Sequence, residues 1–265
     1  LANVRLGRWW ASGIYRNHLE VRDTGMRRWF RTQFYLIDEF LARFHGMRRE
    51  MQYLSDGGHF ENTALYELLR EQRSIRLMVV CDCGADPKYE FADLANLTRL
   101  ARIDFRIELE EDIGAATHPE LGKVFGRTVD FKPDAHGKPP RHDKCAILLN
   151  LYRAKNVPLA ADAQKTSTPD ARIILLKPRV LSNSAADLVE YQVTHPAFPQ
   201  EPTADQFFDE AQWESYRRLG REIAMRVFPG PGSSAEYRKA FVDGVLGRVP
   251  LPETMHATKP TIAAG

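Results

Sequence analysis

The stretch MQYLSDGGHFENTALYELLREQRSIRLMVVCDCG, residues 51–84, decides the fold class of this chain. Its last third, Ser74 to Cys83, is an apolar, β-branched run of strand length that stops at Gly84, which is typical of a buried strand. Beyond it, Phe91 to Leu100 has helical spacing, and Ile103 to Leu109 alternates as a strand does. This part of the chain therefore predicts a strand, a helix and a second strand in close succession.

The residues that precede this strand predict the same alternation. Met51 to Ser55 is a short, partly apolar segment that Asp56-Gly57-Gly58 interrupts. A helix follows, from a cap at Asn62 or Thr63 to about Gln72. Strands that alternate with helices predict an α/β fold with a partly parallel sheet and flanking helices.

The remainder of the chain adds further strands and two helices. Short strands are predicted at Lys123 to Val129, Cys145 to Tyr152 and Arg172 to Val180. Thr203-Ala204-Asp205-Gln206 has the pattern of a capping box and predicts a long helix that Pro229-Gly230 ends, and a last helix is predicted at Ser234 to Leu246. We expect three regions: a basic aromatic segment at 1–50, an α/β region at 51–248 and a loose tail at 249–265.

Composition places the chain among ordinary globular proteins. Of its 265 residues, 43% are hydrophobic and 27% charged, and 37 basic and 35 acidic residues leave a formal net charge of +2. These values exclude a disordered, collagen-like or coiled-coil chain, and no run approaches the roughly eighteen apolar residues of a transmembrane helix. Three cysteines in a chain of this length make no disulfide framework. We expect a cytoplasmic location, or the cytoplasmic face of a membrane.

The first fifty residues differ from the rest in charge and aromatic content. They hold ten arginines, no lysine and five acidic residues, together with Trp9, Trp10 and Trp29. From Met26 to Arg49, apolar residues recur at spacings of four and three, which predicts an amphipathic helix. This stripe consists of Phe30, Phe34, Ile37, Leu41 and Phe44, and the charged residues Arg28, Arg31, Asp38 and Arg43 lie off it. Either the stripe packs on a core, or the segment docks on anionic lipid or another domain.

Asp56, Gly57 and Gly58 are the candidate functional residues. An acid at the end of a strand, followed by two glycines and a helix, lies where α/β proteins build active sites. Glycine permits backbone angles that a side chain forbids, and it lets a reacting group approach closely. Asp-Gly-Gly is also a common turn, so these residues alone leave a catalytic and a structural role open.

Tyr53 to Arg70 also resembles the aspartate motif of patatin-like phospholipases, lipid acyl hydrolases that use a serine–aspartate dyad. In that family the aspartate lies in an Asp-Gly-Gly or Asp-Gly-Ala turn, and Asp56 is the residue that matches. Blocks similar to the bacterial, often membrane-associated branch follow one another in order along most of residues 4–220. They read VRLGRWW, DGGHFENTALYELLR, VVCDCGADP, ARIDFRIELE and TADQFFDEAQWESYRRLG. The resemblance implies the later portion of a patatin-like hydrolase fold.

The family's nucleophile has no counterpart in this sequence. In the family it is the serine of a Gly-X-Ser-X-Gly elbow, and the nearest text here, Gly230 to Ser234, lacks the second glycine and follows a predicted helix. The glycine-rich oxyanion loop of the family is missing too. The resemblance implies that both lie before Leu1, so that this chain supplies the base without the nucleophile.

The implied mechanism is acyl transfer by a serine whose proton passes directly to the carboxylate of Asp56. An aspartate of ordinary pKa, about 3.9, is a weak base at neutral pH, and burial in an apolar acyl-binding cleft would raise that pKa. Backbone donors from upstream would hold the oxyanion, and Gly57 and Gly58 keep the carboxylate unhindered. We expect His59 to make an orienting hydrogen bond or a structural contact, with a general base as the alternative.

The cysteines and the histidines near them indicate structural roles rather than metal binding or catalysis. One residue separates Cys81 from Cys83, whereas zinc sites usually have two to four between paired cysteines, so we expect buried free thiols. His136, His142 and Cys145 lie in a glycine- and proline-rich loop without a fourth ligand at suitable spacing. The sequence has no phosphate-binding glycine loop and no nucleic-acid-binding motif. We therefore expect no cofactor, no metal and no nucleic-acid partner.

Three functions remain open at this point. The first is the later portion of a lipid acyl hydrolase, inactive alone, whose partners are a lipid or acyl-ester substrate, the upstream nucleophile-bearing portion and a membrane surface. The second is a non-catalytic module, derived from such a hydrolase, that docks on a membrane or a protein through its arginine–aromatic front. The third is a self-sufficient enzyme with another nucleophile, such as Ser55 or Cys81.

Overall fold

The computed structural model describes residues 7–13, 25–134, 140, 142–153, 168–202 and 207–247. The chain divides into two compact units, Leu1–Asn62 and Thr63–Gly265, so the Asp-Gly-Gly turn belongs to the first unit. The predicted capping box at Thr203 to Gln206 and the predicted tail lie outside the described residues. Within the described residues, no helix combines the length and the apolar character that crossing a bilayer requires.

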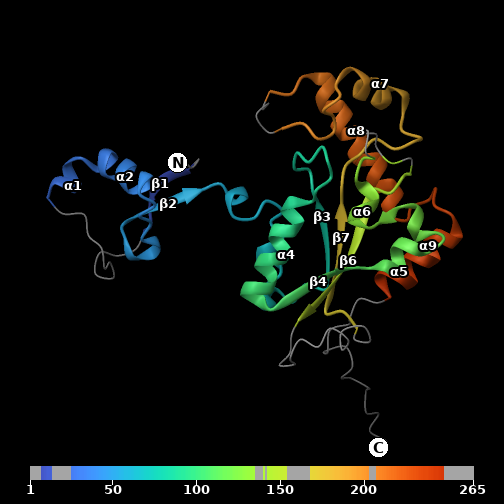
Figure 1. Cartoon of the computed structure of the whole chain (residues 1–265), viewed down its shortest axis with the longest axis horizontal. Helices are drawn as coiled ribbons and strands as arrows, with labels where there is room; N and C mark the ends of the chain where they lie inside the picture. Colours follow the sequence, from blue (N-terminus) through green and yellow to red (C-terminus); the bar gives the residue numbers. More distant parts are fainter. Residues whose placement is uncertain are drawn as a thin grey trace, which may run out of the picture. The chain divides into compact units, whose positions relative to one another are not determined.

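The first unit is a hairpin of two distant strands with two helices between them in the sequence (Figure 1, blue). Strand β1 (Gly7–Ala11) pairs antiparallel with β2 (Met51–Ser55), and α1 (Met26–Trp29) and α2 (Arg31–Phe40) separate them in the chain. The helix predicted from Met26 to Arg49 is thus broken and shorter. It breaks at Phe30, whose φ of −111° and ψ of 46° are not helical, and it ends before Ala42, whose φ is +55°.

The interior of the first unit combines stacked aromatic rings with a buried ion pair. The Trp9 ring stacks on Tyr35 with centroids 4.6 Å apart. Asp38 accepts from Arg49 Nη1 at 2.6 Å and from Arg27 Nη2 at 2.7 Å, and the Asp38 and Arg49 side chains are each 1% exposed. Burial alone would raise the pKa of Asp38, but the two guanidinium groups lower it. The buried side of α2 is therefore formed by Tyr35 and Asp38. Phe30, Ile37 and Leu41 are exposed, so these three residues of the stripe do not take the core position that one of its two interpretations gave them.

The second unit is built on a five-stranded mixed sheet. Its strands are β3 (Leu77–Cys81), β4 (Ile107–Glu111), β5 (Phe125–Gly126), β6 (Ala146–Arg153) and β7 (Ala171–Leu176). Four of them lie in the order β3-β7-β6-β4, and β5 pairs with β6 beyond this path. The pairs β3–β7 and β5–β6 are parallel, and β6–β7 and β4–β6 are antiparallel. The predicted α/β class with a partly parallel sheet is confirmed, but β2 pairs with β1 outside this sheet and β4 runs antiparallel to its neighbour.

Helices cover both faces of this sheet (Figure 1). They are α3 (Leu65–Leu68), α4 (Ala92–Phe105), α5 (Ile113–Thr117), α6 (Thr128–Phe131), α7 (Ala186–Thr194), α8 (Glu210–Val227) and α9 (Ala235–Phe241), followed by one π-helical turn at Val242–Leu246. Alternate residues of β6 and β7 point to opposite faces. Ile147 and Ile173 join the core with α3 and α4, whereas Leu148 and Ile174 join the core with α7, α8 and α9.

The predicted helices of this unit are confirmed with changed ends. The predicted helix from Asn62 or Thr63 to Gln72 is a single turn, α3, with Thr63 Oγ1 accepting from Leu65 N at 3.3 Å. The long helix α8 begins at Glu210, where the Asp209 side chain caps it by accepting from Gln212 N at 2.7 Å. The strand predicted at Lys123 to Val129 contains only the two residues of β5.

A fully buried arginine joins the sheet to the last helical turn. Arg172, at the start of β7, is 0% exposed and forms an ion pair between Nη2 and Asp112 Oδ2. Its Nε donates to Asn150 Oδ1 at 2.9 Å, and its Nη1 donates to the carbonyl oxygens of Gly244 and Val245. Arg172 therefore holds β6, the N-terminus of α5 and the π-helical turn together.

Candidate functional site

The Asp-Gly-Gly turn follows directly on β2, as the sequence predicts. Asp56 is exposed, and its carboxylate Oδ1 accepts a hydrogen bond from the Gly58 N–H at 3.0 Å. A short 3-10 turn at Gly57–His59 comes next, capped by the same carboxylate. The side chain is thus oriented by its own backbone, an Asx turn in which one carboxylate oxygen carries the orienting bond.

The two glycines of the turn are not equivalent. A Cβ on Gly58 would lie 2.9 Å from Asn62 Oδ1 and 3.5 Å from Asp56 Oδ1, whereas a Cβ on Gly57 would meet nothing within 4 Å. Neither residue has a positive φ. The expectation that these glycines supply forbidden backbone angles is therefore wrong. A Cβ at Gly58 would instead displace the Asn62 side chain, and its distance to the carboxylate would be an ordinary contact.

His59 lies against the main chain of the turn and against the preceding serine. Its Nδ1 is 3.2 Å from Ser55 Oγ and 3.3 Å from the carbonyl oxygen of Asp56. With hydrogen on Nδ1, the ring donates to the carbonyl; without it, Nδ1 accepts from the Ser55 hydroxyl. The imidazole is thereby tied to the backbone of the turn, and its proposed orienting role stays a prediction.

A second polar group lies at the carboxyl ends of the parallel strands β3 and β7. Lys177 Nζ, just after β7, lies 3.0 Å from Asp82 Oδ2 and 3.6 Å from Asp86 Oδ2, and the Lys177 and Asp82 side chains are almost fully buried. A cavity of about 320 Å³ adjoins them and extends to the start of α4. Ligands of open α/β sheets often bind at this edge. Sequence reasoning missed Lys177, although a lysine directly after an apolar strand is a signal for it.

The hydrogen bonds of this group are made within the protein. Asp86 accepts from the backbone N–H groups of Glu90 and Phe91 at 2.8 and 2.9 Å, and its own N–H donates to Gln200 Oε1 at 2.9 Å. Lys177 neutralises the buried Asp82. These contacts fix the loop after β3 against β7, which is a structural role.

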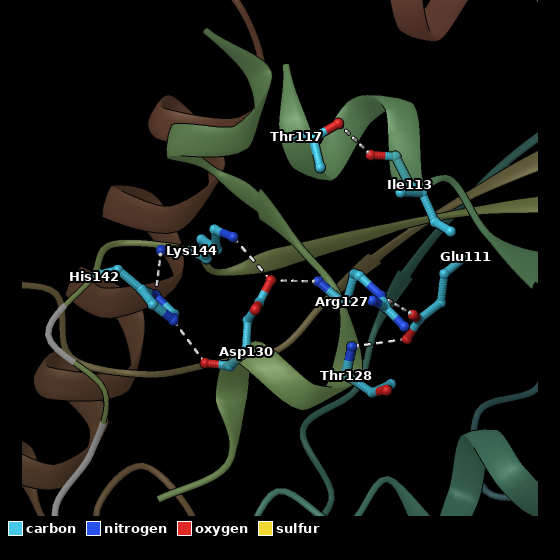
Figure 2. Close-up of polar contacts among 8 residues, drawn as sticks. All are labelled: Glu111, Ile113, Thr117, Arg127, Thr128, Asp130, His142 and Lys144. Atoms are coloured by element: carbon cyan, nitrogen blue, oxygen red, sulfur yellow. Dashed lines mark hydrogen bonds and ion pairs between the residues drawn. The ribbon is translucent and has the colours of Figure 1, made fainter. Parts of the chain in front are cut away.

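A third polar group surrounds Asp130 in the loop region before β6 (Figure 2). The Asp130 carboxylate accepts from the Arg127 N–H at 2.9 Å and from Lys144 Nζ at 2.8 Å. Burial alone would raise the pKa of Asp130, but these two donors lower it. Glu111 accepts from Arg127 Nε at 3.1 Å, so the segment is held by charge-assisted hydrogen bonds.

His142 and Cys145, which the sequence analysis considered as part of a metal cluster, have other surroundings. His142 Nδ1 accepts from the Lys144 N–H at 3.3 Å, which leaves Nε2 to donate to the Asp130 carbonyl at 2.6 Å (Figure 2). Burial raises the pKa of the Cys145 thiol to about 12. His136 lies outside the described residues. Among the described residues, no three His, Cys, Asp or Glu side chains are placed to hold a metal ion.

Cys81 and Cys83 are exposed, so the expectation of buried thiols is wrong for both. Met78 and Val80 point to the buried face of β3, whereas Cys81 points to the opposite, exposed face, and Cys83 lies beyond the end of the strand. Cys145 is the buried cysteine.

The text nearest to a nucleophile elbow, Gly230 to Ser234, connects α8 to α9 rather than a strand to a helix. Ser233 Oγ accepts from the Gly230 N–H at 3.0 Å, and Ser234 Oγ caps α9 by accepting from the Tyr237 N–H at 3.1 Å. Both hydroxyl groups serve the turn and the helix. A cavity of about 630 Å³ lies beside this loop, with Val124, Met225 and Phe228 among its lining residues.

No family model matches the chain, and no curated protein or solved structure matches it either. We therefore infer its function from the residues and contacts described above.

Proposed function

We propose that this chain is the later portion of a patatin-like lipid acyl hydrolase, in which Asp56 is the base of a serine–aspartate dyad. The observation that carries the proposal is the carboxylate at the end of β2, exposed and oriented by the Gly58 N–H at 3.0 Å. A single backbone donor fixes the direction of the carboxylate and leaves room for the serine hydroxyl beside it. The ordered sequence blocks that resemble this family give the reaction class.

The proposed reaction proceeds in two acyl-transfer steps. The serine hydroxyl gives its proton to Asp56 while its oxygen attacks the ester carbonyl carbon, and the tetrahedral intermediate collapses to an acyl-serine. The leaving alcohol takes the proton back from Asp56. Water then attacks the acyl-serine and gives a proton to Asp56. Asp56 passes this proton to the departing serine oxygen, so that the fatty acid is released and the serine hydroxyl and the carboxylate are restored.

The remaining parts of the proposed site belong to the nucleophile-bearing portion. That portion supplies the serine, the backbone donors for the oxyanion and the apolar walls that cover Asp56. The substrate is a glycerophospholipid or another acyl ester, and the reaction as written needs no metal.

The test replaces Asp56 by asparagine in a protein that carries this chain behind a Gly-X-Ser-X-Gly portion. Ester hydrolysis should fall by about 10²–10⁴-fold in kcat, the range for loss of a general base. Asp187→Asn is the matched control, since Asp187 is an exposed carboxylate on α7. Circular dichroism should be unchanged in both variants, and normal turnover by Asp56→Asn would sink the assignment.

The contact between Ser55 and His59 favours one alternative, a hydrolase whose nucleophile lies in this chain. Ser55 Oγ is within hydrogen-bond reach of His59 Nδ1 at 3.2 Å, which is the geometry of a nucleophile with its base. A fluorophosphonate probe distinguishes the two functions, because it labels activated serines. Labelling of Ser55 that disappears in His59→Gln would support this alternative, and an unlabelled 265-residue chain supports the dyad.

A further inference from the structure

The helices of the first unit present a broad apolar surface to solvent. Seven large apolar side chains are between 48% and 86% exposed there: Met26, Trp29, Phe30, Leu36, Ile37, Phe40 and Leu41. We call these residues the α1–α2 face. Folded proteins rarely leave a contiguous apolar patch of this kind without a binding role.

This face is not needed for the interior of its own unit. The opposite side of α2 forms that interior, through Tyr35 and the buried pair of Asp38 with Arg49. Phe40 and Leu41 follow Ile37 by three and four residues, so the three side chains lie together on the outward side of the helix. The unit therefore buries one side of α2 and leaves the more apolar side uncovered.

The charge around the face is positive. Arg28, Arg43 and Arg48 are exposed, and the first fifty residues contain ten arginines, no lysine and five acids. Three of the acids are engaged within the unit: Asp38 is buried between two arginines, Glu39 accepts from the Tyr53 hydroxyl at 2.9 Å, and Glu50 lies 3.7 Å from Arg31. An apolar surface bordered by arginine complements a surface that is apolar inside and anionic outside.

We propose that the α1–α2 face docks on the surface of an anionic lipid bilayer. Helix α2 is then oriented in the plane of the membrane, with Trp29 and Phe40 among the acyl chains and headgroups and with Arg28 and Arg43 on the lipid phosphates. Tryptophan favours this interface because its ring is apolar and its N–H is polar, and guanidinium binds phosphate with two parallel hydrogen bonds. Docking is independent of Asp56, and so of the proposed hydrolase.

Vesicle sedimentation of the 265-residue chain tests this proposal. The vesicles consist of phosphatidylcholine alone, or of phosphatidylcholine with phosphatidylglycerol in about a two-to-one ratio, which gives an anionic surface. The chain should sediment with the anionic vesicles and much less with the neutral ones. The bound fraction should fall as salt rises from about 0.05 M to 0.5 M, because salt screens the arginine attraction.

Two variants and two matched controls separate the apolar and the charged contributions. Trp29→Gln with Phe40→Gln should weaken partitioning at least about tenfold, and Arg28→Gln with Arg43→Gln should weaken it on anionic vesicles only. Trp213→Gln and Arg221→Gln are the controls, since both residues are exposed on α8, and Trp213 is 64% exposed. These controls should bind as the unaltered chain does.

Each remaining outcome decides against the proposal. Absence of sedimentation by a monomeric chain would mean that protein, such as the second unit, covers the face. A dimer in light scattering that Trp29→Gln dissociates would assign the face to a second copy. Equal binding to neutral and anionic vesicles would remove the arginine contribution. Asp56→Asn should sediment normally, so a failed docking test leaves the hydrolase proposal untouched, and the reverse also holds.

Discussion

Replacing Arg172 by methionine should strongly destabilise the second unit. The substitution keeps a long side chain in the sheet but removes the cation that faces Asp112, whose side chain is 5% exposed. Asp112 keeps its bonds from the Ala115 N–H at 2.9 Å and from Asn150 Nδ2 at 3.3 Å. Neither carries a charge, so a buried carboxylate is left without a counter-ion.

The size of the effect follows from this loss. Removing one partner of a buried ion pair costs about 3–5 kcal/mol of unfolding free energy. For a unit of the size of Thr63–Gly265, the melting temperature should fall by about 6–20 °C. Adding Asp112→Asn removes the stranded charge while asparagine can still cap α5, so the double variant should regain part of the lost stability.

Urea denaturation followed by far-ultraviolet circular dichroism measures these changes. Arg217→Met is the matched control, because Arg217 pairs with Glu214 on the surface of α8, with side chains 53% and 50% exposed. An exposed pair of this kind contributes about 0–1 kcal/mol. The reasoning is refuted if Arg172→Met lies within about 1 kcal/mol of the unaltered chain, or if Asp112→Asn destabilises it further.

Two shorter predictions concern the candidate turn and acid stability. Gly58→Ala should lower ester hydrolysis by a complete enzyme, because the new Cβ would lie 2.9 Å from Asn62 Oδ1. Gly57→Ala is the control and should be tolerated, since its Cβ would meet nothing within 4 Å. Equal activity of the two variants would contradict the spatial role of Gly58. Burial alone would raise the pKa of Asp143, but the N–H and hydroxyl of Ser182 lower it below its ordinary value. The stability that this carboxylate contributes is therefore complete above its unfolded pKa of about 3.9 and is lost as pH falls through the lower folded value. Asp143→Asn should make the unfolding free energy depend less on pH in that range, as urea titrations at several pH values can show.

The strands of the second unit could be predicted because each of them has an apolar pattern that is visible in the local sequence. Arg172 to Leu176 and Ala146 to Leu149 are nearly continuous apolar runs, and central strands with helices on both faces need such runs. Their order could not be predicted. The pairing of β3 with β7 joins residues far apart in the chain, such as Leu77 and Arg172, and local periodicity contains no information about which distant segments pair.

The burial pattern of the first unit escaped prediction for a different reason. Hydrophobic periodicity assigns the apolar side of a helix to the interior, but the interior side of α2 is occupied by Tyr35 and the charged Asp38. A carboxylate is buried only with a partner, and Arg49 supplies it from eleven residues further along. The pairing of Gly7 with Ser55 across the hairpin joins residues that are still further apart in the sequence. The Asp56 turn, by contrast, was predictable because its hydrogen bond joins residues two apart.

The position of Arg172 also has a consequence for synthesis of the chain. Two of the acceptors of its guanidinium, the carbonyls of Gly244 and Val245, come more than seventy residues later, since the sequence separations are 72 and 73. A growing polypeptide holds β6 and β7 on the ribosome long before those carbonyls emerge. The guanidinium of Arg172 therefore cannot complete its native hydrogen bonds, and the packing of the helical turn on the sheet cannot form, until synthesis has passed Val245.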